Sequence, residues 1–456
     1  MTGILLVSCY ELGHQPLALA SPLAFLERAG HAAEAVDISV EPFESGTFAR
    51  ARFVAISVPM HTALRLGVRV AEQIRRVNPS CHICFYGLYA SLNADYLLEH
   101  CGDSVIGGEY ESALVALVDS LEGGRSDPLE GVQQRGQAAA PVLQRLPFAV
   151  PSRGALPGLK KYAHLDKGGS KELVGYVEAS RGCLHLCLHC PIPPVYGGRF
   201  FVVPRDIVLD DIRRLAREGA THITFGDPDF LNGPGHSLAI VRAMHAELPS
   251  LTFDFTAKVE HILERAEVFP ELRQLGCAFM VSAVESLSET VLGNLEKGHT
   301  RADVARALRI VREARIAFRP TWVAFTPWTT IEDYLEMFEF VEEEDLIDHV
   351  DPVQFTLRLL VPPGSSLLTR AAITPYLGAL DQAAFIHRWT HPDPRMDMLQ
   401  REASRLVETA GHADPAATFY RLKALAWVTA GRSEAPVPAL APDRRRPPRL
   451  TEAWFC

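Results

Sequence analysis

The chain has 456 residues, which is longer than a single hydrophobic core usually supports, so two or three domains are expected. Hydrophobic residues make up 48% and charged residues 22%, as in water-soluble globular proteins. The net charge of -10 argues against non-specific binding of nucleic acid, because such binding needs a basic surface.

The N-terminus predicts a buried strand, not a targeting signal. "MTGILLVSCYELGHQ" lacks a basic region and its apolar run is short. No stretch of the sequence reaches the roughly 18 apolar residues that a membrane-spanning helix needs. Nine unevenly spread cysteines do not resemble a disulfide framework, so we expect a cytoplasmic protein with no membrane partner.

Residues 1–123 alternate strand and helix patterns. Strands are expected at 4–10, 32–38, 53–59, 82–87 and 104–108, and helices between them. Parallel strands need helical crossovers, so the pattern predicts a doubly wound parallel sheet. Gly87, Gly107 and Gly108 end two of these strands, at the edge where such sheets bind ligands. Glycines that merely turn the chain are the alternative.

Residues 124–170 are rich in Gly, Pro and Gln and predict a linker. A second βα series follows in 171–370. Six strand–helix units are expected there, fewer than the eight of a closed barrel. The predicted fold class is therefore α/β, with a doubly wound first domain and a partial (βα)6 barrel. Residues 371–456 predict a helical C-terminal region and a tail. The six barrel strands are expected at 172–180, 221–227, 252–258, 277–283, 316–325 and 352–360.

The stretch "RGCLHLCLHC" follows the first barrel strand and carries Cys183, Cys187 and Cys190 in C-x3-C-x2-C spacing. A structural zinc site needs four ligands, and the sequence offers no second pair nearby. Cys81 and Cys84 begin a predicted strand, where alternation separates their side chains. Three thiolates suit a four-iron cluster that leaves one iron free of protein ligands. A zinc-stapled binding protein is the alternative.

With this motif the chain resembles the radical S-adenosylmethionine (SAM) superfamily. The resemblance implies that Cys183, Cys187 and Cys190 hold a [4Fe–4S] cluster, and that its open iron binds SAM. It further implies reductive cleavage of SAM to a 5′-deoxyadenosyl radical, with electrons from a donor such as flavodoxin or ferredoxin. His189 fills the position before the last cysteine where the family usually has an aromatic residue, and loop packing is the alternative role for His185 and His189.

The resemblance also implies SAM contacts on three later strands. "FGDPDF" places Gly226, Asp227 and Asp229 where the family binds the SAM amino group, although an Asp-Pro turn is the alternative. On the fourth strand Glu285 is expected near the ribose, joined by Ser282 only if the strand is bulged. Arg319 is expected at the SAM carboxylate, or else on the surface. Lys297 is expected to face solvent.

A doubly wound domain, a linker and such a barrel together resemble the cobalamin-binding branch of this superfamily. That branch implies cobalamin and methyl transfer to a substrate that the sequence does not name. Gly87, Gly107, Gly108 and Glu109 would then contact cobalamin. The D-x-H-x-x-G signature is absent, and His14 has other neighbours. A first domain kept as a scaffold is the alternative.

The last residues, "LTEAWFC", resemble the CUAEP/CCAEP-tail family of radical SAM proteins. In that family a Cys–selenocysteine or Cys–Cys pair precedes Ala-Glu-Pro. The resemblance implies that Cys456 is a redox residue of a selenoprotein whose sequence continues beyond it. A frayed terminal thiol is the alternative.

Overall fold

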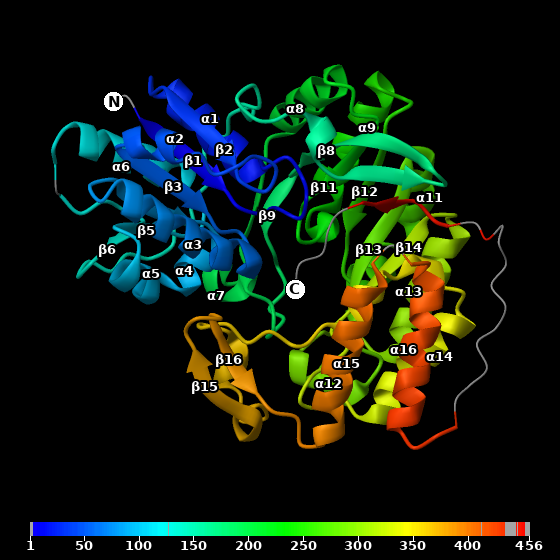
Figure 1. Cartoon of the computed structure of the whole chain (residues 1–456). Coiled ribbons are helices and arrows are strands. Elements are labelled where there is room, and N and C mark those ends of the chain that lie inside the picture. The colour runs from blue at the N-terminus through cyan, green and yellow to red at the C-terminus, as the bar shows by residue number, and fades with distance from the viewer. Residues whose placement is uncertain (1–2, 126, 412, 434–443, 445, 452–456) are drawn as a thin grey trace.

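The computed structural model describes residues 3–125, 127–411, 413–433, 444 and 446–451. Figure 1 shows two α/β units side by side, each built around its own sheet, with the C-terminal helices (orange and red) at one end of the second unit. Among the described residues, none of the helices combines the length and the apolar character that crossing a membrane requires. Cys456 lies outside the described residues.

The first unit is a parallel sheet with helices on both faces. Its strand order is β2-β1-β3-β4-β5, and β6 pairs with β5 in the antiparallel direction. Helices α1 and α6 pack on one face, and α2 to α5 pack on the other. The predicted doubly wound sheet is therefore confirmed. The bounds are β1 Ile4–Ser8, α1 Leu17–Arg28, β2 Ala33–Asp37, α2 Ser45–Arg50, β3 Phe53–Ser57, α3 His61–Val77, β4 His82–Tyr86, α4 Leu88–Leu92, α5 Ala94–His100, β5 Ser104–Ile106, α6 Glu111–Glu122 and β6 Val132–Gln134.

Strand β6 belongs to the segment that the sequence predicts as a linker. Further along the same segment, Val142 forms a parallel bridge with Gly108 at the end of β5. The first unit therefore continues past residue 123, because the start of the linker completes one edge of its sheet.

The second unit is a curled sheet whose order is β14-β13-β12-β11-β8-β7-β17. The five strands from β8 to β14 are parallel, while β7 and β17 extend the sheet in alternating directions. Apolar side chains of the crossover helices cover its outer face. The bounds are β7 His164–Lys167, β8 Ser170–Val177, β9 Ser180–Gly182, α7 Ile192–Tyr196, β10 Phe200–Val202, α8 Arg205–Arg217, β11 His222–Phe225, α9 Pro234–Glu247, β12 Thr252–Thr256, α10 Val259–Glu264, α11 Phe269–Gln274, β13 Cys277–Glu285, α12 Glu289–Leu295, α13 Arg301–Glu313, β14 Ala317–Trp322, α14 Ile331–Glu343 and β17 Arg449–Leu450.

Alternation along the barrel strands separates an apolar outer face from a partly polar interior. On β11, Ile223 and Phe225 pack beneath the helices. His222 takes the opposite face, where its Nε2 lies 2.8 Å from Asp254 Oδ1 and its ring stacks on Phe279. Buried polar groups need such partners, and His222 has found them inside the half-barrel.

The sixth predicted barrel strand, at 352–360, is not a strand. The chain forms a short 3-10 helix at Pro352–Thr356, and only Arg358 makes a bridge, with Phe325. The Gln354 side-chain oxygen accepts the Trp322 backbone N–H at the edge of β14, at 3.0 Å. Backbone pairing in this segment is limited to one bridge, in which Phe325 exchanges hydrogen bonds with Leu357 and Leu359, and the sheet has five parallel strands.

The C-terminal region contains the expected helices α15 (Pro394–Ala410) and α16 (Pro415–Thr429), but also an unpredicted hairpin of β15 (Leu377–Asp381) and β16 (Ile386–Trp389). Phe385 at the tip of the hairpin is 4% exposed and belongs to the core of the first unit, where its ring packs edge-on against Tyr96. The hairpin therefore fastens the C-terminal region to the first unit.

We expect Phe385→Ala to destabilise the first unit by about 3–5 kcal/mol, as is usual when a buried phenylalanine is truncated. Leu380→Ala is the matched control, because Leu380 is in the same hairpin but is 37% exposed. Urea unfolding followed by circular dichroism measures both. Equal, small shifts for the two variants would show that the hairpin tip does not anchor the first unit.

Candidate functional site

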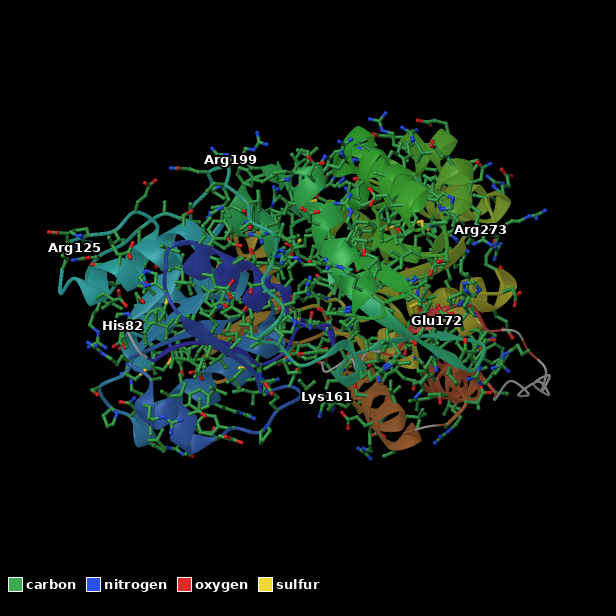
Figure 2. All side chains as sticks on the ribbon, turned by 90° about the horizontal axis from the view of Figure 1, so that it is seen from above. His82, Arg125, Lys161, Glu172, Arg199 and Arg273 are labelled. Carbon is green, nitrogen blue, oxygen red and sulfur yellow. The ribbon has the colours of Figure 1, made fainter. Side chains whose placement is uncertain are left out.

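The cysteine loop lies between the two units. It starts after β9, which pairs with β10, and runs into α7. Figure 2, which looks from above, shows side chains filling the junction between the units. Cys183 and Cys187 are buried and Cys190 is half-buried. Burial, with Cys187 and Cys183 nearby, raises the pKa of Cys190 to about 12. A free thiolate is therefore disfavoured here, and a metal would have to displace the protons.

The spacing of the thiols separates zinc from an iron–sulfur cluster. Zinc holds its sulfur ligands at about 2.3 Å, so they lie within roughly 4 Å of one another. Among the described residues, the one group of three ligand atoms that all lie within 4.8 Å of one another is His185, Asp229 and His261, and it contains no cysteine. A cluster binds each thiolate through a different iron, which suits more widely spaced sulfurs. The donor set fits a cluster.

Both histidines of the cysteine loop contact carboxylates at the ends of barrel strands. His189 Nε2 lies 3.2 Å from Glu285 Oε1 at the end of β13. His185 Nε2 lies 3.5 Å from Asp229 Oδ2, just after β11. These contacts tie both turns of the loop to the mouth of the half-barrel.

Glu285 is held at the mouth by an irregularity in β13. The register with β14 shifts between Ala283 and Glu285, and Glu285 has a φ of 67°, in the left-handed region. Burial alone would raise its pKa, but Lys297 and His189 outweigh this and lower the pKa to about 2. Lys297, expected in solvent, is instead 3% exposed and donates to Glu285 Oε1 at 3.3 Å. The result is a buried, ionised carboxylate beside the cysteine loop.

Asp229 forms the second carboxylate site. Its Oδ2 accepts the Lys258 N–H at 3.1 Å and lies 2.9 Å from His261 Nδ1. Burial opposes ionisation, yet hydrogen bonds from His185 and His261 hold the pKa of Asp229 below its usual value. The Lys258 ammonium lies 3.3 Å from His185 Nδ1 and would repel a metal ion bound by these three residues. The group is therefore better suited to hydrogen bonding than to a cation.

Asp227 and Gly226, expected at the SAM amino group, make contacts within the chain. Asp227 accepts the Ala179 N–H at 2.9 Å and the Ser180 hydroxyl at 2.5 Å, so it braces the segment leading to the cysteine loop. A Cβ at Gly226 would collide with the Tyr176 hydroxyl. Close packing against Tyr176 explains this glycine.

Asp227→Asn is expected to flatten the pH dependence of stability. Burial raises the Asp227 pKa from 3.8 to about 7, so the native chain binds more protons than the unfolded chain between these values. Stability is therefore lost as pH rises from about 4 to about 7, by up to about 1.4 kcal/mol per pH unit.

Urea midpoints of the cluster-free chain at pH 5 and pH 8 measure this. Compared with the native chain, Asp227→Asn should have a relatively higher urea midpoint at pH 8 than at pH 5, since the amide stays uncharged and keeps an acceptor for the Ala179 N–H. Asp206→Asn is the control, because that carboxylate is 83% exposed. The same difference in urea midpoint between the variant and the native chain at pH 5 and at pH 8 would contradict the expectation.

Ser282 and Arg319 do not reach the mouth. Ser282 shares the strand face of Met280, which packs in the outer core, because the bulge begins only after Ser282. Arg319 pairs with Val281, four residues before Glu285, and donates to Asp351 Oδ2 at 2.9 Å. The expected bulge exists, but it redirects only Glu285.

Comparison with known proteins agrees with this geometry. Residues 177–341 match the profile of the Radical SAM superfamily. This part of the chain, which includes the cysteine loop, is therefore similar to proteins of that superfamily. The chain is 25% identical over 340 residues to the hopanoid C-3 methylase of Methylococcus capsulatus, covering 72% of this chain and 64% of that protein. It is 23% identical over 307 residues to an uncharacterised methyltransferase of Pyrococcus horikoshii, covering 64% of each. The chain thus spans less than two thirds of these relatives.

Two solved structures share the fold of the second unit together with the first unit. The cobalamin-dependent S-adenosylmethionine radical enzyme OxsB superposes with a TM-score of 0.71 at 15% identity, covering 93% of this chain and 72% of that chain. The radical S-adenosylmethionine methyltransferase TsrM from Kitasatospora setae gives 0.63 at 19% identity, covering 80% and 75%. At these identities the likeness establishes the fold alone.

The glycines expected to contact cobalamin lie against the chain itself. A Cβ at Gly108, where φ is 73°, would collide with the Val142 carbonyl oxygen. A Cβ at Gly107 would meet Ser91 at 2.7 Å, and Gly87 (φ 104°) lies against the backbone at Val58. The Glu109 carboxylate contacts Arg181 and Tyr196, which flank the cysteine loop. Gly107, Gly108 and Glu109 therefore do not fit a cobalamin site, because the chain itself fills the space beside both glycines and engages the carboxylate.

Sequence reasoning missed four residues around the radical SAM motif: Lys258, His261, Arg181 and Tyr196. A cation at Arg181, directly before the three cysteines, was the available signal, since a charge that becomes buried requires a partner. Two of the partners of Arg181 are Glu109 and Glu111, which lie about 70 residues earlier in the chain. No pattern in the sequence connects them with Arg181.

Proposed function

We propose that the chain cleaves SAM reductively at a [4Fe–4S] cluster and generates a 5′-deoxyadenosyl radical. The observation that carries this is the cysteine loop at the mouth of the half-barrel, whose three thiols are buried or half-buried and are not drawn together as zinc ligands would be. The matched superfamily profile covers the same residues. The substrate is unassigned.

The roles of the residues follow from their positions. Cys183, Cys187 and Cys190 would hold the cluster, which supplies the electron that breaks the carbon–sulfur bond of SAM. Glu285 would accept hydrogen bonds from the ribose hydroxyls of SAM. Asp229, expected at the SAM amino group, is left out because Lys258 and His261 already engage it. Arg319 is left out of this assignment because Asp351 already holds it in mid-strand. An electron donor such as flavodoxin or ferredoxin completes the scheme.

Anaerobic reconstitution tests the proposal. The protein should bind about four irons and four sulfides, turn brown, and form 5′-deoxyadenosine from SAM when dithionite is added. Colourless protein with stoichiometric zinc and no iron would instead support the zinc-stapled binding protein.

Cobalamin-dependent methyl transfer is a more specific proposal for the reaction. The two relatives above are named as methylases or methyltransferases, and both solved structures combine the two units. Three of the residues predicted for cobalamin, Gly107, Gly108 and Glu109, do not support it, so the roles assigned above involve only the cluster and SAM. A corrinoid spectrum after reconstitution with hydroxocobalamin would support the proposal; its absence would leave the first unit as a scaffold.

A redox role for Cys456 rests on the tail resemblance and is a separate proposal. The nucleotides after the Cys456 codon test it. A UGA codon followed by codons for Ala-Glu-Pro would support a selenoprotein, and any other continuation would remove that assignment. A cytoplasmic location also stays an expectation.

A further inference from the structure

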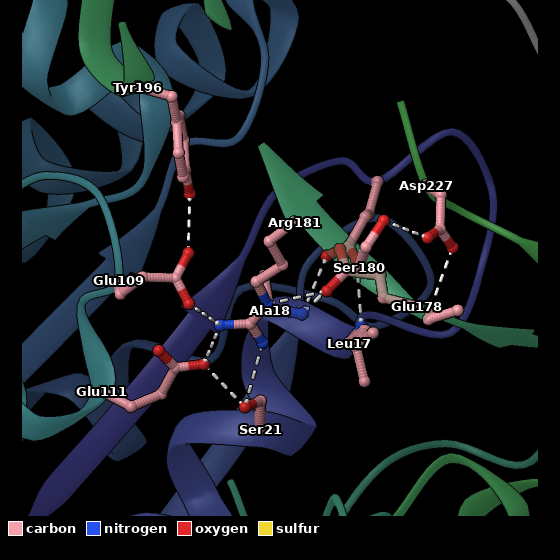
Figure 3. A network of polar contacts seen from close by, with 12 residues as sticks. Leu17, Ala18, Ser21, Glu109, Glu111, Glu178, Ser180, Arg181, Tyr196 and Asp227 are labelled. Atoms are coloured by element: carbon pink, nitrogen blue, oxygen red, sulfur yellow. Dashed lines mark hydrogen bonds and ion pairs between the residues drawn. The ribbon is translucent and has the colours of Figure 1, made fainter. Parts of the chain in front are cut away.

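Glu109 joins the first unit to the cysteine loop through both of its carboxylate oxygens. It lies between β5 and α6 and is completely buried. Oε1 accepts the Tyr196 hydroxyl at 2.9 Å, and Oε2 lies 3.4 Å from Arg181 Nη1. Figure 3 shows this carboxylate between the tyrosine on one side and the guanidinium on the other. One side chain of the first unit thus contacts two segments of the second.

These two partners bracket the cysteines in the sequence. Arg181 is two residues before Cys183, and Tyr196 is six residues after Cys190. The backbone also closes at this point, because the Cys183 N–H donates to the Arg199 carbonyl at 3.2 Å. Any movement of Glu109 is therefore passed to both ends of the loop.

Arg181 is held by more partners than Glu109 alone. Its Nη1 lies 2.6 Å from Glu111 Oε1, and its Nε lies 2.9 Å from Glu178 Oε2. The Ser21 hydroxyl lies 3.2 Å from its Nη2. Glu111 is the first residue of α6, so two of the three carboxylates around this guanidinium belong to the first unit. Its position is therefore set mainly by the first unit.

Such a network is better explained by geometry than by stability. Burying several charges costs desolvation energy that ion pairing often fails to recover, so buried ion networks add little net stability. Charge-assisted hydrogen bonds are directional, however, and fix the angles at which the groups meet. The network is suited to holding the loop in one place.

We propose that Glu109 is a positioning residue that holds both ends of the cluster-binding loop against the first unit, and that the first unit thereby sets the environment of the cluster. This rests on the proposed function. It assigns the first unit a part in radical generation whether or not it binds cobalamin.

The test compares reconstituted Glu109→Gln, Arg181→Lys and Tyr196→Phe with the native protein. Iron content, thermal midpoint, the EPR spectrum of the reduced cluster with SAM, its midpoint potential, and the rate of 5′-deoxyadenosine formation are measured. Glu247→Gln is the control, because Glu247 also pairs with an arginine, Arg213, but in an exposed position on the second unit. It should behave as the native protein.

We expect Glu109→Gln to keep its iron but to change the EPR spectrum and the potential, and to slow 5′-deoxyadenosine formation roughly tenfold to a hundredfold, since small displacements at a reacting centre have effects of this size. Tyr196→Phe, which removes one hydroxyl, should change the spectrum in the same direction but less. Arg181→Lys keeps the charge but loses the planar set of donors, and should resemble Glu109→Gln.

Native spectrum, potential and rate in Glu109→Gln would overturn the proposal. If Glu109→Gln does not fold, Tyr196→Phe decides, and an unchanged EPR spectrum in that variant would overturn it equally. Failure of the native protein to bind iron or to cleave SAM would count against the proposed function instead, so the two failures are distinguishable.

Discussion

Cys183→Ala is expected to abolish the [4Fe–4S] cluster and all formation of 5′-deoxyadenosine. The two remaining thiols would have to hold a cluster that already lacks a fourth protein ligand. Cys190 would instead stay protonated, because burial raises its pKa to about 12. Cys187→Ala and Cys190→Ala should give the same loss.

Cys277→Ala is the control for this series. Cys277 is also fully buried in the second unit, but it lies at the start of β13 in the core. That variant should keep its full iron content and lose only the packing of one sulfur atom. Iron and sulfide analysis, visible absorbance of the cluster and chromatography of the nucleoside product are the measurements. Iron at the native level in any of the three loop variants would contradict the assignment.

The parts of the fold that could be predicted are those with local patterns. Apolar strands that alternate with amphipathic helices predicted both parallel sheets, because this periodicity determines which face is buried. The sixth barrel strand was wrong because the segment pairs with the chain after β14 only at Phe325, while at Trp322 the Gln354 side chain takes the backbone hydrogen bond. The hairpin at β15 and β16 escaped notice because its tip residue, Phe385, is buried only through contact with another unit.

In the candidate site, too, residues grouped by local spacing were predictable and residues brought together only by the fold were not. Spacing alone identified Cys183, Cys187 and Cys190, since all three lie in one loop. The carboxylates were harder, because Asp227 and Asp229 are two residues apart but face different partners. Glu109 was expected at cobalamin because its segment resembles the Gly-containing strand ends of the cobalamin-binding branch. The structure pairs it with residues on either side of the cysteine loop, far along the chain, and no local pattern shows that pairing.

Glu285→Gln is expected to destabilise the cluster-free chain by about 3–5 kcal/mol, because it leaves the Lys297 ammonium buried without a carboxylate. Lys297 is 3% exposed and its Nζ lies 3.3 Å from Glu285 Oε1. Lys297→Met should also destabilise, through the unpaired carboxylate. The double variant should recover most of the loss, since both charges are then gone. Urea unfolding of the four proteins measures the coupling between the pair.

The double variant also separates stability from function. His189 loses its ionised acceptor when Glu285 becomes Gln, so one turn of the cysteine loop is no longer held as in the native chain. The reconstituted double variant should therefore be nearly as stable as the native protein and yet form 5′-deoxyadenosine more slowly. The exposed pair Arg301 and Glu336 provides a comparison site, and Glu336→Gln with Arg301→Met should leave both properties unchanged. Additive losses in the Glu285 and Lys297 cycle would show that the buried pair does not act as a unit.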